Sequence, residues 1–517
     1  MRNVINLTTL PYQDNVTKFI YSLLRNPYLW VILISFTIRL ATLNDYPIGD
    51  TTEARYSEIS RKILETGNWV TLRYLNGEPF WGKPPLLFWL QAISFKLFGI
   101  NEFSARLPSI FISLLIVNLV FYFAKIQLGK SQAWIASTLL STNVLFLILS
   151  GSVIPEPLLL LSTTLSMIAF WQTINDRGKY WGYLFFIGLA IGLLSMGPFA
   201  AVVIAMPVIA WLIMHDDWRY QLQRFPLFTG TLLMLVISLP WYLMAEHATP
   251  GFLNYYIIGE HLNRYITQDW PGNMYGSTHS SFTGAIWLYW LAATFPMSLI
   301  LLIALLTLIK RKKSKTVQIL REDFSLYLIL WIFTLIFFFT FTRNATMSYV
   351  FIIIPATSML ATKLWHIKSE QNDINNKRAR KSISFIALSG VLFPLIFLAT
   401  ILFYMPSVAD RNSEKFLIED YKKMNNGGDE RLFYLYDRPA SALFYSHGKA
   451  DVIYSERKII PIIKQESKIF LAIPVSYLSH VSKDTMQCLV QLEQFGRNIL
   501  FEGNKQKCNT IALSAAK

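Results

Sequence analysis

The chain is long, apolar and basic: it has 517 residues, of which 53% are hydrophobic and 15% are charged, and its mean hydropathy is +0.38. This balance excludes an ordinary soluble domain and predicts a membrane protein with several spans. The formal net charge of +15 does not indicate a nucleic-acid partner, because the basic residues cluster in short loops beside hydrophobic segments, as in KRKKSK at 310–315. We therefore expect a lipid bilayer, and no nucleic acid, as the partner of the chain.

Eleven apolar segments are predicted to cross the membrane, since most approach the ~20 residues that cover about 30 Å of hydrocarbon. They are 28–44, 104–127, 131–149, 156–173, 181–196, 198–214, 225–244, 282–309, 325–342, 347–365 and 383–405. The first is expected to be retained as an anchor, because polar residues precede it and no small-residue cleavage site follows it. The run 84–99 is apolar but only about 24 Å long as a helix, so we expect it to lie at the membrane interface.

Charges in the loops predict the orientation of the chain. With 84–99 at the interface, the most basic loops fall on one side, which the positive-inside rule assigns to the cytoplasm. These loops are 125–130, 175–179, 215–224, 310–321 and 363–381. The N-terminus is then cytoplasmic, and the loops 45–103 and 245–281 lie on the outer face together with the C-terminal tail.

The composition divides the chain into two domains. Residues 1–405 form the predicted membrane domain, whereas 406–517 alternate short apolar runs with charged and turn residues, which predicts a small α/β domain. Cys488 and Cys508 are the two cysteines of the chain. In an oxidising compartment a disulfide between them is plausible, and the alternative is two unpaired thiols.

The first outer loop contains a long polar insertion at 49–89. Thr51 and Thr52 followed by Glu53 predict the start of a helix on which Glu53 and Tyr56 share a face. Later in the loop Lys83 stands between aromatic residues and prolines. Such a lysine can meet a phosphate at the membrane surface, or it can simply extend from a helix end toward the interface.

Glu156 is a second feature of this face, because it lies between Pro155 and Pro157 at the end of an apolar span. A carboxylate close to hydrocarbon is costly and usually has a functional partner. The structural alternative is that Glu156 stabilises the beginning of the next helix.

The second outer loop adds acid and histidine side chains at Glu260, His261 and His279, and Arg264 and Tyr275 as well. Neighbouring acids and histidines raise the possibility of a divalent metal, but Glu260 and His261 are adjacent instead of helically spaced, and no zinc-type cluster follows. We therefore assign no metal ligands and no cofactor, and a divalent metal is kept as the alternative. A guanidinium offers a bidentate fork, so Arg264 is more readily a phosphate ligand.

Several motifs occur in a fixed order between about residues 28 and 365. They are DTTEARYSEISRKILETGNWVT, FWGKPPL, the outer acid before a span, LLSMGPFA, LPWYLMAEH, GFLNYYIIGEHLNRY and TRNATMSYVFIIIP. In this combination the chain resembles the bacterial lipid A aminoarabinose transferase group, within the protein O-mannosyltransferase-like membrane glycosyltransferases of the GT-C fold. The resemblance implies an all-α membrane domain of roughly 11–13 helices with interfacial helices, plus a small α/β periplasmic domain. It also implies an inverting transferase in the bacterial inner membrane that takes a sugar from a polyprenyl phosphate at the periplasmic face.

The acids depart from the family pattern. Family members usually carry an acidic pair directly before the Ala-Arg-Tyr-like motif, whereas this chain has Thr52 and Glu53 there and Asp50 upstream. Either Asp50 or Glu53 is therefore a candidate for the first acid. Glu156 replaces the common aspartate, which lengthens the side chain by one methylene.

Two further departures affect ligand binding. Gly82 stands where close relatives have a glutamate before Lys-Pro, which weakens the case for a metal. Met196 stands where many members have a lysine before Gly-Pro, so one expected phosphate contact is absent. The chain is a variant branch, and its sugar can differ too.

Displacement at the anomeric carbon assigns the donor-side roles. The departing polyprenyl phosphate gains negative charge, which cations stabilise, and we expect Arg55, Lys83 and Arg264 to bind it. Residues also expected to contact substrate are Tyr56, Arg106, Glu260, His261, Tyr275, His279, Arg343 and Tyr349.

The catalytic carboxylates are predicted to be Asp50, Glu53 and Glu156, which orient the acceptor or take its proton. A lipid A phosphate, with a second pKa near 6, needs little such help, whereas a hydroxyl needs a base. The expected reaction moves an amino sugar, such as aminoarabinose or a hexosamine, from undecaprenyl phosphate to lipid A or another envelope glycan. The alternatives are a same-fold transferase to a protein or polysaccharide hydroxyl, and a lipid transporter or flippase.

Overall fold

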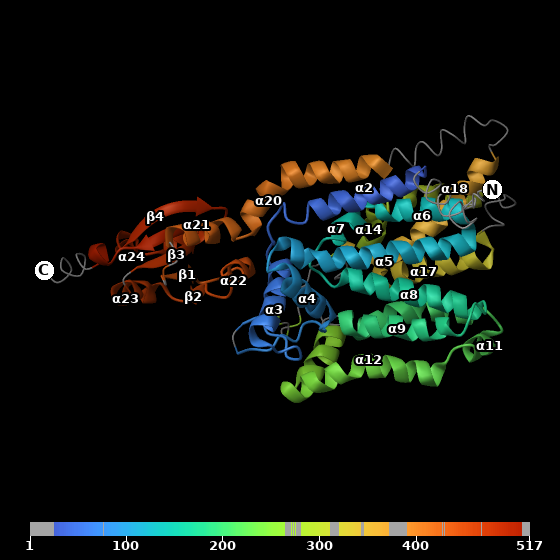
Figure 1. The fold of residues 1–517 in the computed structure, drawn as a ribbon, viewed down its shortest axis with the longest axis horizontal. Coiled ribbons are helices and arrows are strands. Elements are labelled where there is room, and N and C mark those ends of the chain that lie inside the picture. Colours follow the sequence, from blue (N-terminus) through green and yellow to red (C-terminus); the bar gives the residue numbers. More distant parts are fainter. Residues whose placement is uncertain are drawn as a thin grey trace, which may run out of the picture.

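The structure is a computed structural model that describes residues 25–75, 77–263, 270, 272, 274–275, 281–310, 320–342, 346–371, 390–425, 428, 430–466 and 468–508. A bundle of long helices carries a smaller domain with a β-sheet at one end, and α3 (Thr52–Thr66) and α4 (Leu86–Phe98) lie between the two parts (Figure 1). The predicted combination of a helical membrane domain and a small α/β domain is confirmed.

Six helices of the described residues are long and apolar enough to cross a membrane. They are α5 (Glu102–Leu128), α8 (Glu156–Ile174), α12 (Leu227–Ala248), α17 (Asp323–Thr340), Met347–Trp365 from η2 (Met347–Ile353) and α18 (Ile354–Gln371), and Gly390–Asn412, which includes η3 (Thr400–Tyr404) and α20 (Met405–Asn412). A seventh candidate is the bent pair α14 (Ala285–Ala293) and α15 (Met297–Lys310), whose axes differ by 114°. The expectation of a multi-pass membrane protein is therefore confirmed.

Two predicted spans are not continuous helices. The segment 131–149 divides into α6 (Lys130–Ser141) and α7 (Val144–Leu149), and the segment 282–309 divides into α14 and α15. Asn143 begins α7 by accepting a hydrogen bond from the Phe146 amide at 3.0 Å. Hydropathy misses such breaks because the residues on both sides remain apolar.

Three more predicted spans are short helices. α2 (Pro27–Ala41), α9 (Tyr180–Met196) and α10 (Pro198–Ile213) are apolar and have 15, 17 and 16 residues. At 1.5 Å per residue each is about 22–26 Å long, somewhat less than the hydrocarbon thickness. The total of eleven spans stays a prediction.

α3 and α4 form a layer at the end of the bundle that faces the sheet domain (Figure 1). α3 begins at the predicted Thr-Thr-Glu sequence and ends at Thr66, and the φ of 68° at the following residue, Gly67, favours glycine. The Gln91 side chain of α4 accepts a hydrogen bond from Ser60 Oγ at 2.6 Å and donates one to Ser57 Oγ at 3.1 Å. These buried polar contacts fix α4 on α3. Two short helices, α11 (Trp218–Gln223) and the π-helix η1 (Asn254–Asn263), flank α12 in the chain.

The C-terminal domain contains a five-stranded sheet in the order β2-β1-β3-β5-β4. β1 (Arg431–Leu435) pairs in parallel with β2 (Asp451–Ile453) and β3 (Ile469–Pro474), and β5 (Asn498–Gly503) pairs antiparallel with β3 and β4 (Leu489–Phe495). Its helices are α21 (Lys415–Asn425), α22 (Ala440–Tyr445), η4 (Glu456–Lys458), α23 (Ile459–Gln465), η5 (Val475–His480) and α24 (Lys483–Gln487). The helix that begins at Gly390 continues to Asn412, beyond the predicted domain boundary at 405.

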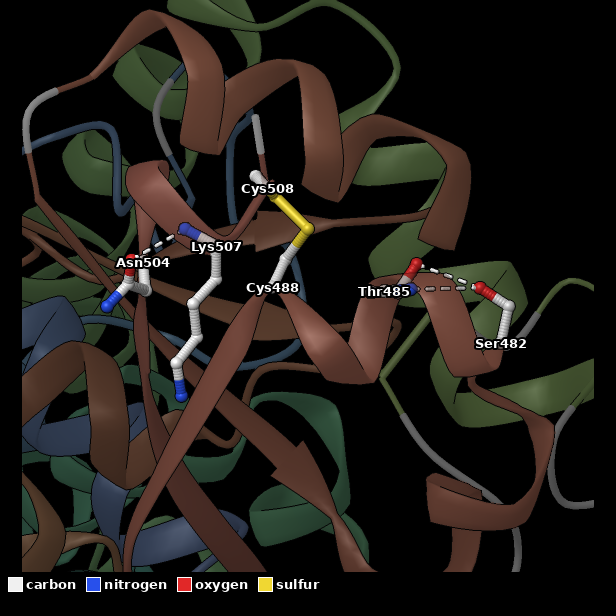
Figure 2. Close-up of a disulfide and its surroundings, with 6 residues drawn as sticks. All are labelled: Ser482, Thr485, Cys488, Asn504, Lys507 and Cys508. Atoms are coloured by element: carbon white, nitrogen blue, oxygen red, sulfur yellow. Dashed lines mark hydrogen bonds between the residues drawn. A yellow bond between two sulfur atoms is a disulfide. The ribbon is translucent and has the colours of Figure 1, made fainter. Parts of the chain in front are cut away.

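The predicted disulfide between Cys488 and Cys508 is present and buried (Figure 2). Cys488 follows α24, where Ser482 Oγ accepts a hydrogen bond from the Thr485 amide at 3.3 Å, and Cys508 closes the helical turn after β5. The bond therefore ties the end of the described chain to the edge of the sheet.

Candidate active site

A cavity of about 500 Å³ lies between α3 and the ends of the membrane helices. It is lined by Thr52, Tyr56, Gly82, Lys83, Ile154, Pro155, Glu156, Met196, Phe199, Glu260, His261, Phe339, Thr342, Thr346, Ser348 and Tyr349. Six of these were predicted as site residues: Tyr56, Lys83, Glu156, Glu260, His261 and Tyr349. The first outer loop, the start of α8 and the second outer loop thus meet at one site, although they are far apart in the sequence.

Glu156 is the first residue of α8 and lines the cavity together with Lys83. Its carboxylate interacts electrostatically with Lys83 and lies within hydrogen-bonding reach of the Ser348 hydroxyl. The Glu156 Oε2 atom is buried without a hydrogen-bond partner among the described residues. Because an unsatisfied buried carboxylate oxygen is costly, Oε2 is suited to accept a hydrogen bond from a bound substrate.

His261 closes another side of the cavity. Its Nδ1 atom lies 2.7 Å from the carbonyl oxygen of Tyr256, and its Nε2 atom lies 3.2 Å from that of Met196. Burial lowers the pKa of His261 and outweighs the effect of the two carbonyls, so the imidazole is neutral at pH 7. It then donates to one carbonyl only, and it contributes no positive charge to phosphate binding.

Glu53 follows Thr52 in the sequence, but its side chain binds residues outside the cavity lining. Its Oε2 atom accepts a hydrogen bond from Arg106 Nη2 and its Oε1 atom one from the Val153 amide, each at 2.9 Å. Burial alone would raise the pKa of Glu53, but the Arg106 charge and these hydrogen bonds hold it below its ordinary value. Glu53 is therefore an ionised partner of Arg106.

Arg106 is buried and holds the segment that precedes α3. Its guanidinium donates to the carbonyl oxygens of Leu43 (2.8 Å), Tyr46 (2.8 Å) and Pro47 (2.9 Å) as well as to Glu53, and it lies 3.7 Å from the centre of the Tyr46 ring. These contacts hold the chain that leads into α3. The structure does not bring Arg106 into the cavity lining.

Asp50 is directed toward the C-terminal domain. Its carboxylate accepts hydrogen bonds from the Ser441 amide (2.7 Å), Ser441 Oγ (2.8 Å) and Arg497 Nη2 (2.5 Å). Burial raises the pKa of Asp50, although Ser441 and Arg497 act in the opposite direction. The two rival first acids thus have different partners, and neither is in the cavity lining, where Thr52 lies instead.

Arg55 and Tyr275 meet each other beside the cavity. Arg55 Nη1 donates to the Tyr275 carbonyl at 2.9 Å, and the Tyr275 hydroxyl accepts a hydrogen bond from the Trp81 amide at 2.9 Å. The Tyr275 ring packs on Phe80 with ring centres 4.5 Å apart. Arg55 and Tyr275 therefore link the two outer loops, and the contact with Trp81 is two positions from Lys83 in the sequence.

Three predicted site residues, Arg264, His279 and Arg343, lie outside the described residues. Within the described part of the chain, no group of three or more His, Cys, Asp and Glu side chains is arranged to hold a metal ion.

The sequence prediction omitted several lining residues. Thr52 was noted as part of a helix start and as a departure from the family pattern, and Ser348 lies in the quoted motif TRNATMSY beside Tyr349, so position in a motif was the available signal. The aromatic wall was also missed: Phe339 and Tyr349 stack with ring centres 4.8 Å apart, and Phe199 lies 5.9 Å from Tyr349. Phenylalanines within apolar spans carry no signal that separates a cavity wall from a helix contact.

Comparison with known sequences supports the resemblance. Residues 22–256 match the family model described as dolichyl-phosphate-mannose-protein mannosyltransferase. The chain is 30% identical over 249 residues to the undecaprenyl phosphate-alpha-4-amino-4-deoxy-L-arabinose arabinosyl transferase of Enterobacter sp. (strain 638), which covers 47% of this chain and 44% of that protein. It is 27% identical over 386 residues to transferase 1 of that name from Proteus mirabilis (strain HI4320), which covers 71% and 66%. The match thus spans less than half of the Enterobacter protein.

Comparison with solved structures decides the fold. The crystal structure of ArnT from Cupriavidus metallidurans bound to undecaprenyl phosphate matches with a TM-score of 0.73 at 17% identity, over 92% of this chain and 98% of that chain. The chain has the GT-C fold. The sequence and fold comparisons both agree with the resemblance predicted from the sequence, and the cavity belongs to the membrane domain of this fold.

Proposed function

We propose that the chain is an inverting glycosyltransferase that moves an amino sugar from undecaprenyl phosphate to lipid A at the periplasmic face of the inner membrane. The observation that carries the proposal is that Lys83 and Glu156, a cation and a carboxylate, line one cavity. The curated relatives are named as aminoarabinose transferases that use undecaprenyl phosphate, and the ArnT structure contains undecaprenyl phosphate. Both support the donor class.

Lys83 acts on the donor. The sugar leaves when the bond between its anomeric carbon and the phosphate oxygen breaks, and undecaprenyl phosphate gains one negative charge. An ammonium in a cavity with aromatic and aliphatic walls stabilises that charge more strongly than it would in water. Arg264 and Arg343 remain candidates for additional phosphate contacts. Met196 contributes no charge to the cavity wall.

Glu156 acts on the acceptor. A lipid A phosphate monoester loses its second proton near pH 6, so below that pH it reaches the cavity as a monoanion. The free Oε2 atom of Glu156 can then take the remaining proton while a phosphate oxygen attacks the anomeric carbon. A dianion needs no such proton transfer, and Glu156 then only orients the acceptor.

The predicted orientation completes the proposal. The Cys488–Cys508 disulfide is the kind of bond that persists in the periplasm, and the basic loops favour a cytoplasmic location. We therefore assign the C-terminal domain and the cavity to the periplasmic side, where the sugar on undecaprenyl phosphate meets lipid A.

The test is transfer by the purified full chain in lipid nanodiscs, with aminoarabinose on undecaprenyl phosphate as donor and lipid A as acceptor, followed by mass spectrometry. We expect one added amino sugar, and loss of transfer in Lys83→Gln but not in Lys179→Gln, which alters an exposed lysine at the beginning of α9. An unmodified lipid A mass with the wild-type chain, together with modification of a saccharide hydroxyl under the same conditions, would replace lipid A by a hydroxyl acceptor.

A further inference from the structure

The segment 43–53 is held from two sides before it enters α3. From the membrane domain, Arg106 on α5 binds three carbonyl oxygens of residues 43–47 and the Glu53 carboxylate. From the C-terminal domain, Ser441 and Arg497 bind the Asp50 carboxylate. The next residues of α3, Thr52 and Tyr56, line the cavity. A contact made by the C-terminal domain is thus only two residues from the cavity wall.

The backbone repeats this connection. The Asp50 amide donates to the Asn412 carbonyl at 2.8 Å, and Ser413 Oγ donates to the Ile48 carbonyl at 2.8 Å. The Tyr445 hydroxyl accepts a hydrogen bond from the Ile48 amide at 2.7 Å and donates one to Glu102 Oε1 at 2.9 Å. These contacts fix the backbone on both sides of Gly49, which a side-chain contact alone would not do.

Tyr445 also links the two sides. Glu102 lies one helical turn before Arg106 on α5, so both residues are on the same face of that helix. Lys415 adds an ion pair to Glu102 at 2.8 Å. The helix α5 therefore connects the contacts that the C-terminal domain makes with Glu102 to the Arg106–Glu53 pair.

On the domain side, Asp50 belongs to a built polar cluster. Arg497 also contacts Glu414 Oε1 at 3.5 Å, and Asn498 Nδ2 donates to the same oxygen at 2.7 Å. Ser441 Oγ accepts a hydrogen bond from the Glu414 amide at 3.0 Å. Glu414 is 3% exposed in its side chain and Asp50 is 7% exposed, whereas Arg497 is 47% exposed. The Asp50 carboxylate thus depends on one accessible guanidinium and one serine, whereas Glu414 is also held by Asn498 and by the Tyr434 hydroxyl at 3.0 Å.

We propose that Arg497 and Ser441 of the C-terminal domain are positioning residues of the transferase, which hold Asp50 and thereby set the first turn of α3 against the donor cavity. The C-terminal domain is then a part of the active-site frame. Loss of the Asp50 contact then displaces the wall formed by Thr52 and Tyr56, although the contacts of Arg106 and of the backbone remain. This assignment depends on the proposed function for its kinetic test, but not for its binding test.

The binding test titrates undecaprenyl phosphate into the full chain in nanodiscs and follows the affinity of Arg497→Gln, Arg497→Lys and Asp50→Asn. We expect Arg497→Gln and Asp50→Asn each to weaken binding several-fold, and Arg497→Lys to restore most of the loss because it keeps the charge. In a double-mutant cycle, Asp50→Asn combined with Arg497→Gln should be no weaker than either single variant, because both remove the same contact. Fully additive losses would overturn the proposal.

The matched control is Arg431→Gln, which breaks an exposed ion-pair site with Asp451 and Glu466 elsewhere on the same domain. It should leave undecaprenyl phosphate affinity unchanged. The melting temperature of each variant separates a loss of folding from a displaced cavity wall. We expect Arg497→Gln and Arg431→Gln to have the same melting temperature, while only Arg497→Gln weakens binding. Equal affinities for these two variants would overturn the positioning role even if transfer to lipid A is observed.

The kinetic test compares KM for the donor with kcat. Loss of position should raise KM for the donor several-fold in Arg497→Gln, with partial recovery in Arg497→Lys. If the wild-type chain transfers no sugar, the proposed function fails, and the binding test still decides the role of Arg497.

Discussion

The pair of Glu53 and Arg106 gives a quantitative test of how the approach to α3 is held. Glu53 accepts one hydrogen bond on each oxygen, from Arg106 and from the Val153 amide, and the Arg106 side chain is fully buried. In Glu53→Gln only one acceptor oxygen remains. The side-chain NH2 group that replaces the other oxygen meets an N–H donor and cannot form a hydrogen bond with it. The Arg106 charge also loses its counterion. An unsatisfied buried donor costs about 1–3 kcal/mol, and removing one partner of a buried ion pair costs about 3–5 kcal/mol. Because the Glu53 side chain is 20% exposed and water can enter, we expect about 2–4 kcal/mol.

The assay is the free energy of unfolding in mixed micelles, measured by denaturant titration of tryptophan fluorescence. The matched control is Glu65→Gln on the same helix, because Glu65 is 52% exposed and its pair with Arg61 at 2.8 Å should contribute about 0–1 kcal/mol. The pKa of Glu53 is lowered in the folded chain, so its stabilisation is present above its unfolded pKa and is lost as the pH falls through the folded pKa. The difference between wild type and Glu53→Gln should therefore shrink in acid. A loss for Glu53→Gln within about 0.5 kcal/mol of that for Glu65→Gln would refute the reasoning.

Three further predictions concern other parts of the chain. Replacing Cys488 by Ser removes the disulfide that closes a loop of sequence separation 20, and should lower the stability of the C-terminal domain by about 3 kcal/mol. The measurement is thermal melting with and without reductant. Reductant should lower the melting temperature of the wild type and leave that of the variant unchanged. The pKa of His261 is lowered by burial, so stability should fall as the pH drops below about 6.5, and His261→Gln should have a weaker pH dependence of melting between pH 7.5 and 5. Met196→Lys adds a cation to the cavity wall and should lower KM for the donor severalfold with little change in kcat; a raised KM would show that donor phosphate does not approach Met196.

Local sequence signals predicted the parts of the structure that depend on near neighbours. The start of α3 follows from Thr52 and Glu53, and the sheet domain follows from its alternating runs. Hydropathy located the membrane helices because apolar length is a local property. It failed at Asn143, where a side-chain cap interrupts an apolar run.

The roles of the acids depended on distant residues and could not be predicted from spacing. Asp50 and Glu53 are three positions apart, and the sequence left them as equal candidates for the first acid. Their partners, Arg497 and Arg106, lie far away in the chain and on opposite sides of the segment. Glu156 was easier, because a carboxylate between two prolines at a span end has few structural uses, and it is the one of the three acids that lines the cavity.

The pH dependence of transfer in Glu156→Gln tests the central claim most directly. Wild type and variant are compared with aminoarabinose on undecaprenyl phosphate and lipid A across pH 5 to 8, with the product mass as readout and Glu156→Asp as the conservative control. At the acidic end, where the acceptor phosphate is a monoanion, we expect kcat of Glu156→Gln to be about 10²–10⁴-fold below that of the wild type. It should recover in part above the second pKa of the acceptor phosphate. Glu156→Asp should retain much of the activity at every pH. Full activity of Glu156→Gln across the range would contradict the assignment of this cavity as the site of transfer.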